Sequence, residues 1–273
     1  MLSFASLAAL TPRDSRYLFL LSHMRSYSSL LSHLLGSSPD IDGYGEMHVR
    51  YRSQLSLLAL RWKVQHSIDA PLQGQWLLDK ILHNKIRAPW RLLSAERCSV
   101  VIFLRPPEAT LRSLLAMKPT RPGERAWNDQ RACDYYVTRL HRLRSDGEML
   151  CARALYMDAD ALMNNAPRVL QRLGQWLGLS QPLTPNYQLF PRTGETRIGD
   201  PSGSILAGVI DPERTQRHPE RIIDKSVLKE ATAAYLRCRA ILMRQCTTNS
   251  DLLSADPVAG VFPTAASRSF VQS

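Results

Sequence analysis

The sequence predicts an α/β fold of three layers, a central parallel sheet flanked by helices on both faces. Short apolar stretches alternate along the chain with longer amphipathic ones, the order expected of strands and helices in such a fold. Several of the short stretches are continuously apolar, as is typical of parallel strands that are covered on both sides. The 273 residues fit one domain, expected over residues 1–246. Residues 247–273 are polar and small and are expected to form a disordered tail.

The first strand, loop and helix form the most informative part of the sequence. Residues 17–21 are apolar and predict an interior strand, and apolar residues recur on one helical face from Leu30 to Leu35. Gly36 can end this helix in a left-handed conformation. The loop between strand and helix holds one cation and three hydroxyls: Arg25, Ser26, Ser28 and Ser29. Because a helix N-terminus offers unpaired N–H groups and a positive dipole end, this loop is suited to hold an anion.

The remaining elements follow from the same two patterns, short apolar runs for strands and apolar residues on one face for helices. Further strands are expected at the short apolar stretches 41–45, 76–82, 98–104 and 149–156, with 98–104 the clearest and most central. Helices are expected at 47–65, 108–117, 128–144, 167–177 and 225–245. Residues 182–219 show no periodicity, and a connection that long inside a domain is usually functional.

A second phosphate-binding element is expected beside the first loop. Arg105 ends the strand at 98–104, and Ser113 lies eight residues on, two turns into the next helix. An arginine and a serine placed in this way can hold a phosphate through charge-assisted hydrogen bonds. Ligands of parallel sheets bind at the carboxyl ends of the strands, so the Arg25 loop and Arg105 should share one edge.

Composition narrows the class of ligand and the location of the protein. The chain has 35 Lys and Arg against 24 Asp and Glu, a net charge of +11 that favours anionic ligands. No block of five like charges appears, so a nucleic-acid-binding arm is not expected. The five cysteines show no metal-binding spacing, which indicates reduced thiols, a cytoplasmic protein and no metal. No apolar run reaches the ~18 residues of a transmembrane anchor.

Nucleotide-binding motifs with glycine are absent from the first loop. The Walker A motif needs GxxxxGK[ST], but Ser22 to Ser29 contain neither glycine nor lysine, and GxGxxG is missing for the same reason. The strand, loop and helix nevertheless fit a P-loop-like arrangement. A phosphotransferase or nucleotide hydrolase therefore stays open as an alternative, and magnesium dependence would distinguish it.

Four motifs in one order resemble the sulfotransferase superfamily, which uses 3′-phosphoadenosine 5′-phosphosulfate (PAPS). The family's [KR]-S-G-[ST]-[ST] loop corresponds to Arg25-Ser-Tyr-Ser-Ser29, and its R-x(7)-S signature to Arg105 and Ser113. Two further phrases, Tyr156-Met-Asp158 and Trp176-Leu-Gly-Leu179, resemble family sequences as well. The resemblance covers about residues 17–179 and looks closest to soluble bacterial members that act on carbohydrates or small molecules.

The resemblance implies a P-loop-like sulfotransferase fold and the transfer of a sulfuryl group from PAPS to a hydroxyl, leaving 3′,5′-ADP (PAP). It places the 5′-phosphate at Ser26, Tyr27, Ser28 and Ser29, and makes Arg25 the cation beside the leaving oxygen. The 3′-phosphate would bind Arg105 and Ser113, and the late loop with Arg192 and Gly194 would cover the nucleotide. These residues make up the expected nucleotide site.

One residue of the first loop departs from the family pattern, because Tyr27 stands where the family has glycine. A bulky residue does not easily take a positive φ. We therefore expect either that the loop turns differently or that Tyr27 packs over the nucleotide or the acceptor.

The acceptor side is less defined. The base that takes the acceptor's proton is either Glu46 or His48, with Glu46 slightly favoured because Gly45-Glu46 resembles the branch of the family that uses glutamate. Lys80 follows an apolar stretch and could reach the sulfonate or the acceptor. The partners implied are the nucleotide donor and a small-molecule, lipid or glycan acceptor. A non-catalytic module that only binds PAP or another anion is the remaining alternative.

Overall fold

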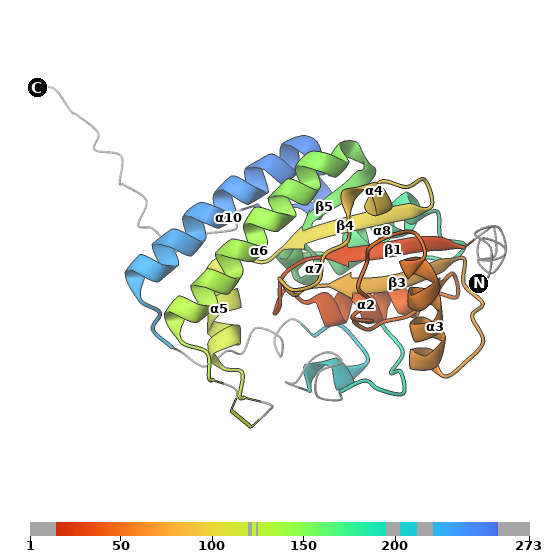
Figure 1. Ribbon diagram of the computed structural model, residues 1–273, viewed down its shortest axis with the longest axis horizontal. Helices are drawn as coiled ribbons and strands as arrows, with labels where there is room; N and C mark the ends of the chain where they lie inside the picture. The colour runs from red at the N-terminus through yellow and green to blue at the C-terminus, as the bar shows by residue number, and fades with distance from the viewer. Residues whose placement is uncertain (1–14, 120–121, 124, 195–202, 212–220, 256–273) are drawn as a thin grey trace, which may run out of the picture.

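Five parallel strands form the centre of the molecule, in the order β2-β3-β1-β4-β5 (Figure 1). The computed structural model describes residues 15–119, 122–123, 125–194, 203–211 and 221–255. The strands are β1 (Arg16–Leu21), β2 (Ile41–Asp42), β3 (Trp76–Ile81), β4 (Cys98–Leu104) and β5 (Ala154–Asp158). The predicted parallel sheet is confirmed, and β2 is its short edge strand.

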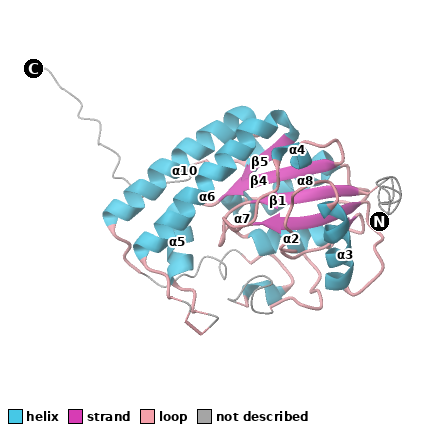
Figure 2. Cartoon of the chain, viewed as in Figure 1, coloured by secondary structure: helices cyan, strands magenta, loops and turns pink. Residues whose placement is uncertain are grey.

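Helices cover both faces of the sheet, which confirms the three layers (Figures 1 and 2). On one face the core includes α3 (Ser56–Ile68), α4 (Trp90–Leu93), α5 (Pro107–Leu115), α6 (Asp129–Leu150) and α10 (Lys225–Gln245). On the other it includes α2 (Ser28–Gly36), α7 (Ala159–Asn164) and α8 (Ala166–Leu177). Short 3₁₀ turns occur at Cys151–Arg153, Ser204–Ala207 and Ser250–Leu252.

Strand β4 shows why the strands are apolar throughout. Val100, Ile102 and Leu104 belong to the first core, whereas Val101 and Phe103 belong to the second. Successive side chains point to opposite faces of a strand, and here both faces are covered by helices. The continuous apolar run is therefore required by the layer structure.

Two predictions about glycines are wrong, the helix end at Gly147 and the left-handed conformation of Gly36, because both glycines allow close packing. A side chain at Gly147 would clash with Leu242 of α10, so α6 runs through this glycine to Leu150 and the expected strand at 149–156 starts only at Ala154. Gly36 is the last residue of α2 and is not left-handed. A side chain there would clash with the carbonyl oxygen of Gly43.

The helix predicted at 47–65 is also wrong in its first half. The helix α3 begins at Ser56, and residues 47–55 form an irregular segment. Its side chains Val49 and Tyr51 are buried in the first core all the same. The apolar residues of this segment therefore reflect burial without helical structure.

Part of the expected C-terminal tail is folded onto the domain. Thr247 bridges to Leu155 of β5, and Leu252 is fully buried. The backbone N–H of Ser254 donates to the carboxylate of Asp158, 2.8 Å away. The domain boundary expected at residue 246 is thus too early for residues 247–255, and residues 256–273 lie outside the described part.

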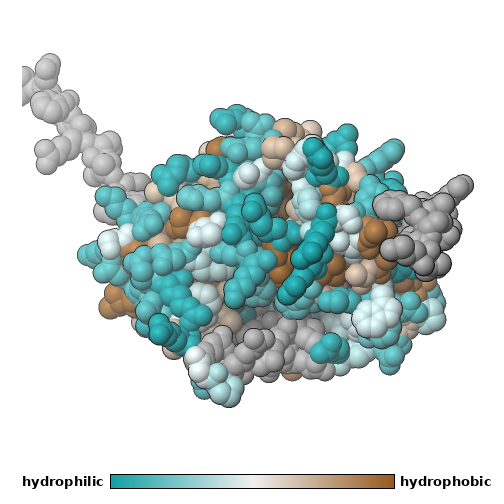
Figure 3. Space-filling model, viewed as in Figure 1, coloured by the Kyte–Doolittle hydropathy of each residue, from teal (hydrophilic) through white to brown (hydrophobic). Residues whose placement is uncertain are grey.

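Hydrophilic residues cover most of the face that Figure 3 shows, with hydrophobic ones in small groups. Across the described residues, none of the helices is both long and apolar enough to cross a membrane.

Candidate functional site

The loops after β1 and β4 lie together at the carboxyl edge of the sheet. The hydroxyl of Ser22 donates to the carbonyl of Phe103 over 2.6 Å, and the N–H of Arg105 donates to Nε2 of His23 over 3.0 Å. These bonds follow from the parallel pairing of β1 with β4. The expectation that the Arg25 loop and Arg105 share one edge is confirmed.

The β1–α2 loop turns through two left-handed residues, Arg25 with φ of 65° and Tyr27 with φ of 64°. Tyr27 therefore takes the positive φ that its bulk was expected to prevent. Its ring stacks on the guanidinium of Arg105, whose central carbon lies 4.0 Å from the ring centroid. A left-handed backbone costs a residue with a side chain about 1–2 kcal/mol, and a cation–π contact with a desolvated arginine offsets about 2 kcal/mol.

The first turn of α2 is open to an anion. The first helical hydrogen bond runs from the N–H of Leu31 to the carbonyl of Tyr27, which leaves the N–H groups of Ser28, Ser29 and Leu30 without a partner inside the helix. Among the described residues no side chain caps this end, and the first turn of the helix holds no acidic residue. The positive end of the helix dipole therefore faces this edge of the sheet without compensation.

The hydroxyl of Ser26 does not point to that open turn. It donates to the carbonyl of His23 over 2.7 Å and lies 2.7 Å from the hydroxyl oxygen of Ser22, and the residue is fully buried. Ser26 thus holds the loop together from inside. Its backbone stays in the loop, but its hydroxyl is used by the protein.

Arg25, Arg105 and Ser113 form one cluster. Nε of Arg25 donates to the hydroxyl of Ser113 over 2.7 Å, and Nη1 of Arg105 donates to the carbonyl of Arg25 over 3.1 Å. The structure therefore brings the three predicted residues together, with Arg25 between the other two. Asp160, which the sequence analysis did not single out, lies 3.8 Å from Nε of Arg105.

Buried groups fix the position of Arg105, which is only 3% exposed. Burial lowers the pKa of His23 to about 3, so its imidazole stays neutral and accepts the N–H of Arg105. The hydroxyl of Tyr136 donates to the carbonyl of Arg105 over 2.7 Å. Burial also lowers the pKa of Arg105, but an arginine remains charged at neutral pH. Tyr136 therefore belongs to the buried frame that holds Arg105.

Lys80 and Asp79 are neighbours in β3, and their side chains make contacts on opposite faces of the sheet. The ammonium of Lys80, a buried residue, donates to the hydroxyl of Ser29 over 3.4 Å at the start of α2. Asp79 accepts from the N–H of Met47 over 2.7 Å and from the hydroxyl of Tyr51 over 2.5 Å. Burial raises the pKa of Asp79 to about 7. Lys80 thus joins the anion loop, while Asp79 fixes the segment that carries the candidate bases.

Glu46 and His48 meet at a residue that the sequence analysis missed. The carboxylate of Glu46 lies 3.3 Å from Nε2 of His83, and the ring of His48 stacks on that of His83 at 5.9 Å between centroids. Burial lowers the pKa of His48, and the charge of Glu46 partly opposes this. His83 follows β3 by two residues, and its place just after the end of a strand is the one sequence signal that could have drawn attention to it.

Arg192 and Gly194 lie on the β2 side of the sheet, in a segment docked by aromatic contacts. The ring of Phe190 stacks on Tyr44 at 4.2 Å, and the N–H of Arg192 donates to the hydroxyl of Tyr44 over 3.2 Å. Gly194 has φ of 84° and packs against Leu206. In the strand order, β2 and β4 are separated by β3 and β1. Arg192 therefore approaches the edge from the opposite side to Arg105.

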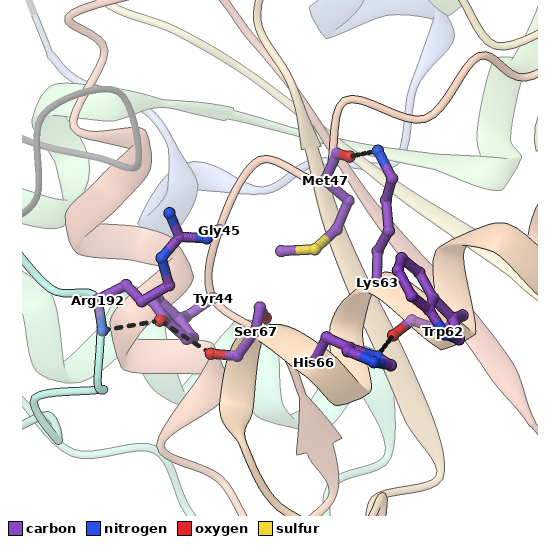
Figure 4. Close-up of a pocket in the computed structure, with 8 residues that line it drawn as sticks. All are labelled: Tyr44, Gly45, Met47, Trp62, Lys63, His66, Ser67 and Arg192. Atoms are coloured by element: carbon purple, nitrogen blue, oxygen red, sulfur yellow. Dashed lines mark hydrogen bonds between the residues drawn. The ribbon is translucent and has the colours of Figure 1, made fainter.

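A cavity of about 250 Å³ opens beside this segment (Figure 4). It lies next to the segment that follows β2 and against α3. The residues that line it are Tyr44, Gly45, Met47, Trp62, Lys63, His66, Ser67 and Arg192. Trp62 lines this cavity, whereas Tyr135 donates its hydroxyl to the carbonyl of Leu82.

Comparisons with known proteins give no match by sequence and clear ones by structure. The sequence matches no protein-family model and no curated protein. A solved sulfotransferase domain from the curacin biosynthetic pathway superposes with a TM-score of 0.52 at 16% identity, covering 86% of this chain and 100% of that one. Mouse sulfotransferase SULT7A1 complexed with PAP gives a TM-score of 0.45 at 13% identity, covering 87% and 91%.

Proposed function

Since this chain has the fold of a sulfotransferase domain, we propose that it transfers a sulfuryl group from PAPS to a hydroxyl of a carbohydrate, lipid or other small molecule. The observation that carries the proposal is the cluster of Arg25, Arg105 and Ser113 beside the open first turn of α2. These are two adjacent sites for anions at one edge of the sheet. A nucleotide with phosphates on both sides of its ribose fits such a pair.

The 5′-phosphate binds at the start of α2 in this proposal. The N–H groups of Ser28, Ser29 and Leu30 face it, and the hydroxyls of Ser28 and Ser29 add donors. Ser26 and Tyr27 contribute their backbone. Lys80 reaches the same place through its contact with Ser29.

The 3′-phosphate binds at Arg105 and Ser113. The hydroxyl of Ser113 accepts from Arg25, so its own hydrogen can be donated to a phosphate oxygen. The guanidinium of Arg105 is buried and fixed, which lowers the entropic cost of binding. Gly194 stays near the nucleotide in the proposal, whereas the position of Arg192 beside the cavity favours a place on the acceptor side.

The chemistry needs positive charge at the leaving oxygen and a base at the acceptor. Sulfuryl transfer resembles phosphoryl transfer, in which charge builds on the leaving group, and in this proposal Arg25 and Lys80 stabilise that charge. The contact of Lys80 with Ser29 at the start of α2 supports this role. Glu46 accepts the proton of the acceptor hydroxyl, and His83 holds its carboxylate. His48 is the alternative base, stacked on the same His83.

The five cysteines, all free thiols, support a cytoplasmic location for this enzyme. The proposal includes no metal, because its cations are supplied by arginine and lysine side chains.

Calorimetric titration with PAP tests the proposal. We expect the wild type to bind PAP and Arg105→Ala to bind at least about tenfold more weakly, since a charge-assisted bond to phosphate is lost. Arg153→Ala is the matched control, because Arg153 precedes β5 at the opposite edge of the sheet and should leave the affinity unchanged. Ser113→Ala, a smaller change, keeps the test valid if Arg105→Ala does not fold. Absence of PAP binding by the wild type would refute the proposal.

A further inference from the structure

We infer that the cavity beside α3 binds the carboxylate-bearing ring of an acidic saccharide, one unit away from the sugar whose hydroxyl is sulfated. This inference rests on the proposed function and specifies the acceptor. The cavity has a volume of about 250 Å³, below the roughly 300–1,000 Å³ of pockets for drug-sized ligands. This volume suits a single ring.

The first reason is an exposed aromatic face. Trp62 is 60% exposed and lies on the wall of the cavity, with its ring 4.0 Å from that of His66 between centroids (Figure 4). His66 also bonds to the carbonyl of Trp62 over 2.8 Å, which fixes the pair on one turn of α3. A large rigid ring that combines an apolar face with a polar N–H group packs well on the C–H face of a sugar.

The second reason is the charge of the cavity. Among the residues that the structure describes, its lining includes Arg192 and Lys63 and no acidic residue. The ammonium of Lys63 donates to the carbonyls of Met47 over 2.7 Å and His48 over 3.3 Å. An ammonium has three hydrogens, so one more bond is available to a ligand. Two cations with an aromatic face select a ring that carries a negative charge.

The third reason is position. Gly45 and Met47 line the cavity, and Glu46 stands between them in the chain. The carboxylate of Glu46 lies 3.3 Å from Nε2 of His83, and Glu46 is not among the residues that line the cavity. A ring held in the cavity therefore lies next to the candidate base without occupying the place of the reacting hydroxyl.

Saturation-transfer NMR with three probes tests the inference on the full chain: methyl β-D-glucuronide, methyl β-D-glucoside and acetate. We expect the glucuronide to bind and the uncharged glucoside to bind about tenfold more weakly, the effect of one charge-assisted hydrogen bond. Acetate, a charge without a ring, should bind more weakly still. Arg192→Ala should lose the preference for the glucuronide over the glucoside, and Trp62→Ala should lose the preference for the glucuronide over acetate.

The matched controls are Trp90→Ala and Arg91→Ala, an exposed tryptophan with an arginine over its ring on α4, outside the cavity lining. Both should bind the glucuronide like the wild type. PAP titration of the same samples separates the two proposals. If PAP binds but the glucuronide binds no better than glucoside or acetate, or if Trp62→Ala keeps the preference for the glucuronide over acetate, the acceptor inference is wrong and the proposed function stands. If PAP does not bind, the proposed function fails on its own test.

Discussion

Tyr27 shows how a single residue can keep a loop conformation that glycine would adopt more easily. Its left-handed backbone is unfavourable for a residue with a side chain, and its ring gains a contact with a buried guanidinium. The balance of these two effects decides whether the tyrosine stabilises the loop. Their magnitudes favour the ring contact.

Replacing Tyr27 measures this balance. In Tyr27→Gly the strain of about 1–2 kcal/mol is relieved, but a contact of about 2 kcal/mol is lost and the greater chain entropy of glycine costs about 0.5–1 kcal/mol, so the free energy of unfolding should fall by about 1 kcal/mol. Tyr27→Phe keeps the ring and should stay within about 0.5 kcal/mol of the wild type. Both are read from chemical denaturation. A glycine variant as stable as the wild type would show that the ring contact contributes nothing.

The environment of His48 gives a second prediction at this scale. The charge of Glu46 raises the pKa of His48 and the imidazole of His83 lowers it, while burial lowers it most. Glu46→Gln should therefore lower the pKa of His48 further, and His83→Ala should raise it. An NMR titration of the His48 ring protons measures both shifts. If the pKa of His48 shifted in the opposite direction in either variant, or did not shift, the assigned influence of Glu46 and His83 on His48 would be wrong.

Residue spacing predicted some of these contacts and could not predict others. Arg105 and Ser113 are placed by a strand end and two helical turns, so their spacing carried the information. The pairing of Glu46 with His83 depends on an irregular segment after β2, which has no periodicity to read. The hydroxyl of Ser26 likewise turns inward because of its neighbours in space.

At the scale of elements, a buried carboxyl holds the segment after β2 against β3. Asp79 accepts two hydrogen bonds from this segment, at Met47 and Tyr51, and both candidate bases lie beside them. The sequence indicated a helix here because the buried side chains are apolar. These side chains are buried because the segment is hydrogen-bonded to Asp79, a contact between distant residues that a local sequence pattern does not reveal.

Asp79 should make stability depend on pH. Its folded pKa of about 7 lies above its usual value of 3.8, so between these values the folded state binds more protons than the unfolded state. The stability that the neutral carboxyl provides is full below pH 4 and is lost as the pH rises through 7. In the Asp79→Asn variant this side chain cannot ionise, so the variant lacks this pH dependence and serves as the reference.

The wild type should therefore lose stability relative to Asp79→Asn between pH 4 and pH 8, by no more than about 4 kcal/mol. Urea denaturation of the two proteins across this range measures the difference, in which groups common to both cancel. A difference that does not change with pH would contradict the assignment.

At the scale of the whole molecule, the sequence predicted the layers and the sheet edge but not where the domain ends. The apolar runs of the strands and the apolar faces of the helices recur along the whole chain, so many residues specify the layer architecture. The end of the domain depends on single contacts: Thr247 with β5, Leu252 in the second core and Ser254 with Asp158. Such contacts leave no pattern in a polar stretch.

Two truncations test the boundary. A chain ending at residue 246 should lose at least about 2 kcal/mol of stability, because burial of Leu252 alone contributes about 1.5–3 kcal/mol. A chain ending at residue 255 keeps these contacts and is the matched control. Thermal unfolding of the two should differ clearly. Equal melting temperatures would mean that residues 247–255 add nothing to the domain.

The central claim is that one sheet edge holds a nucleotide by phosphates on both sides of its ribose. Calorimetry of the wild type with PAP, 5′-AMP and 3′-AMP tests it most directly. Two charge-assisted sites acting together predict that PAP binds at least about tenfold more tightly than either monophosphate. A wild type that does not bind PAP, or that binds 5′-AMP equally well, would contradict the account.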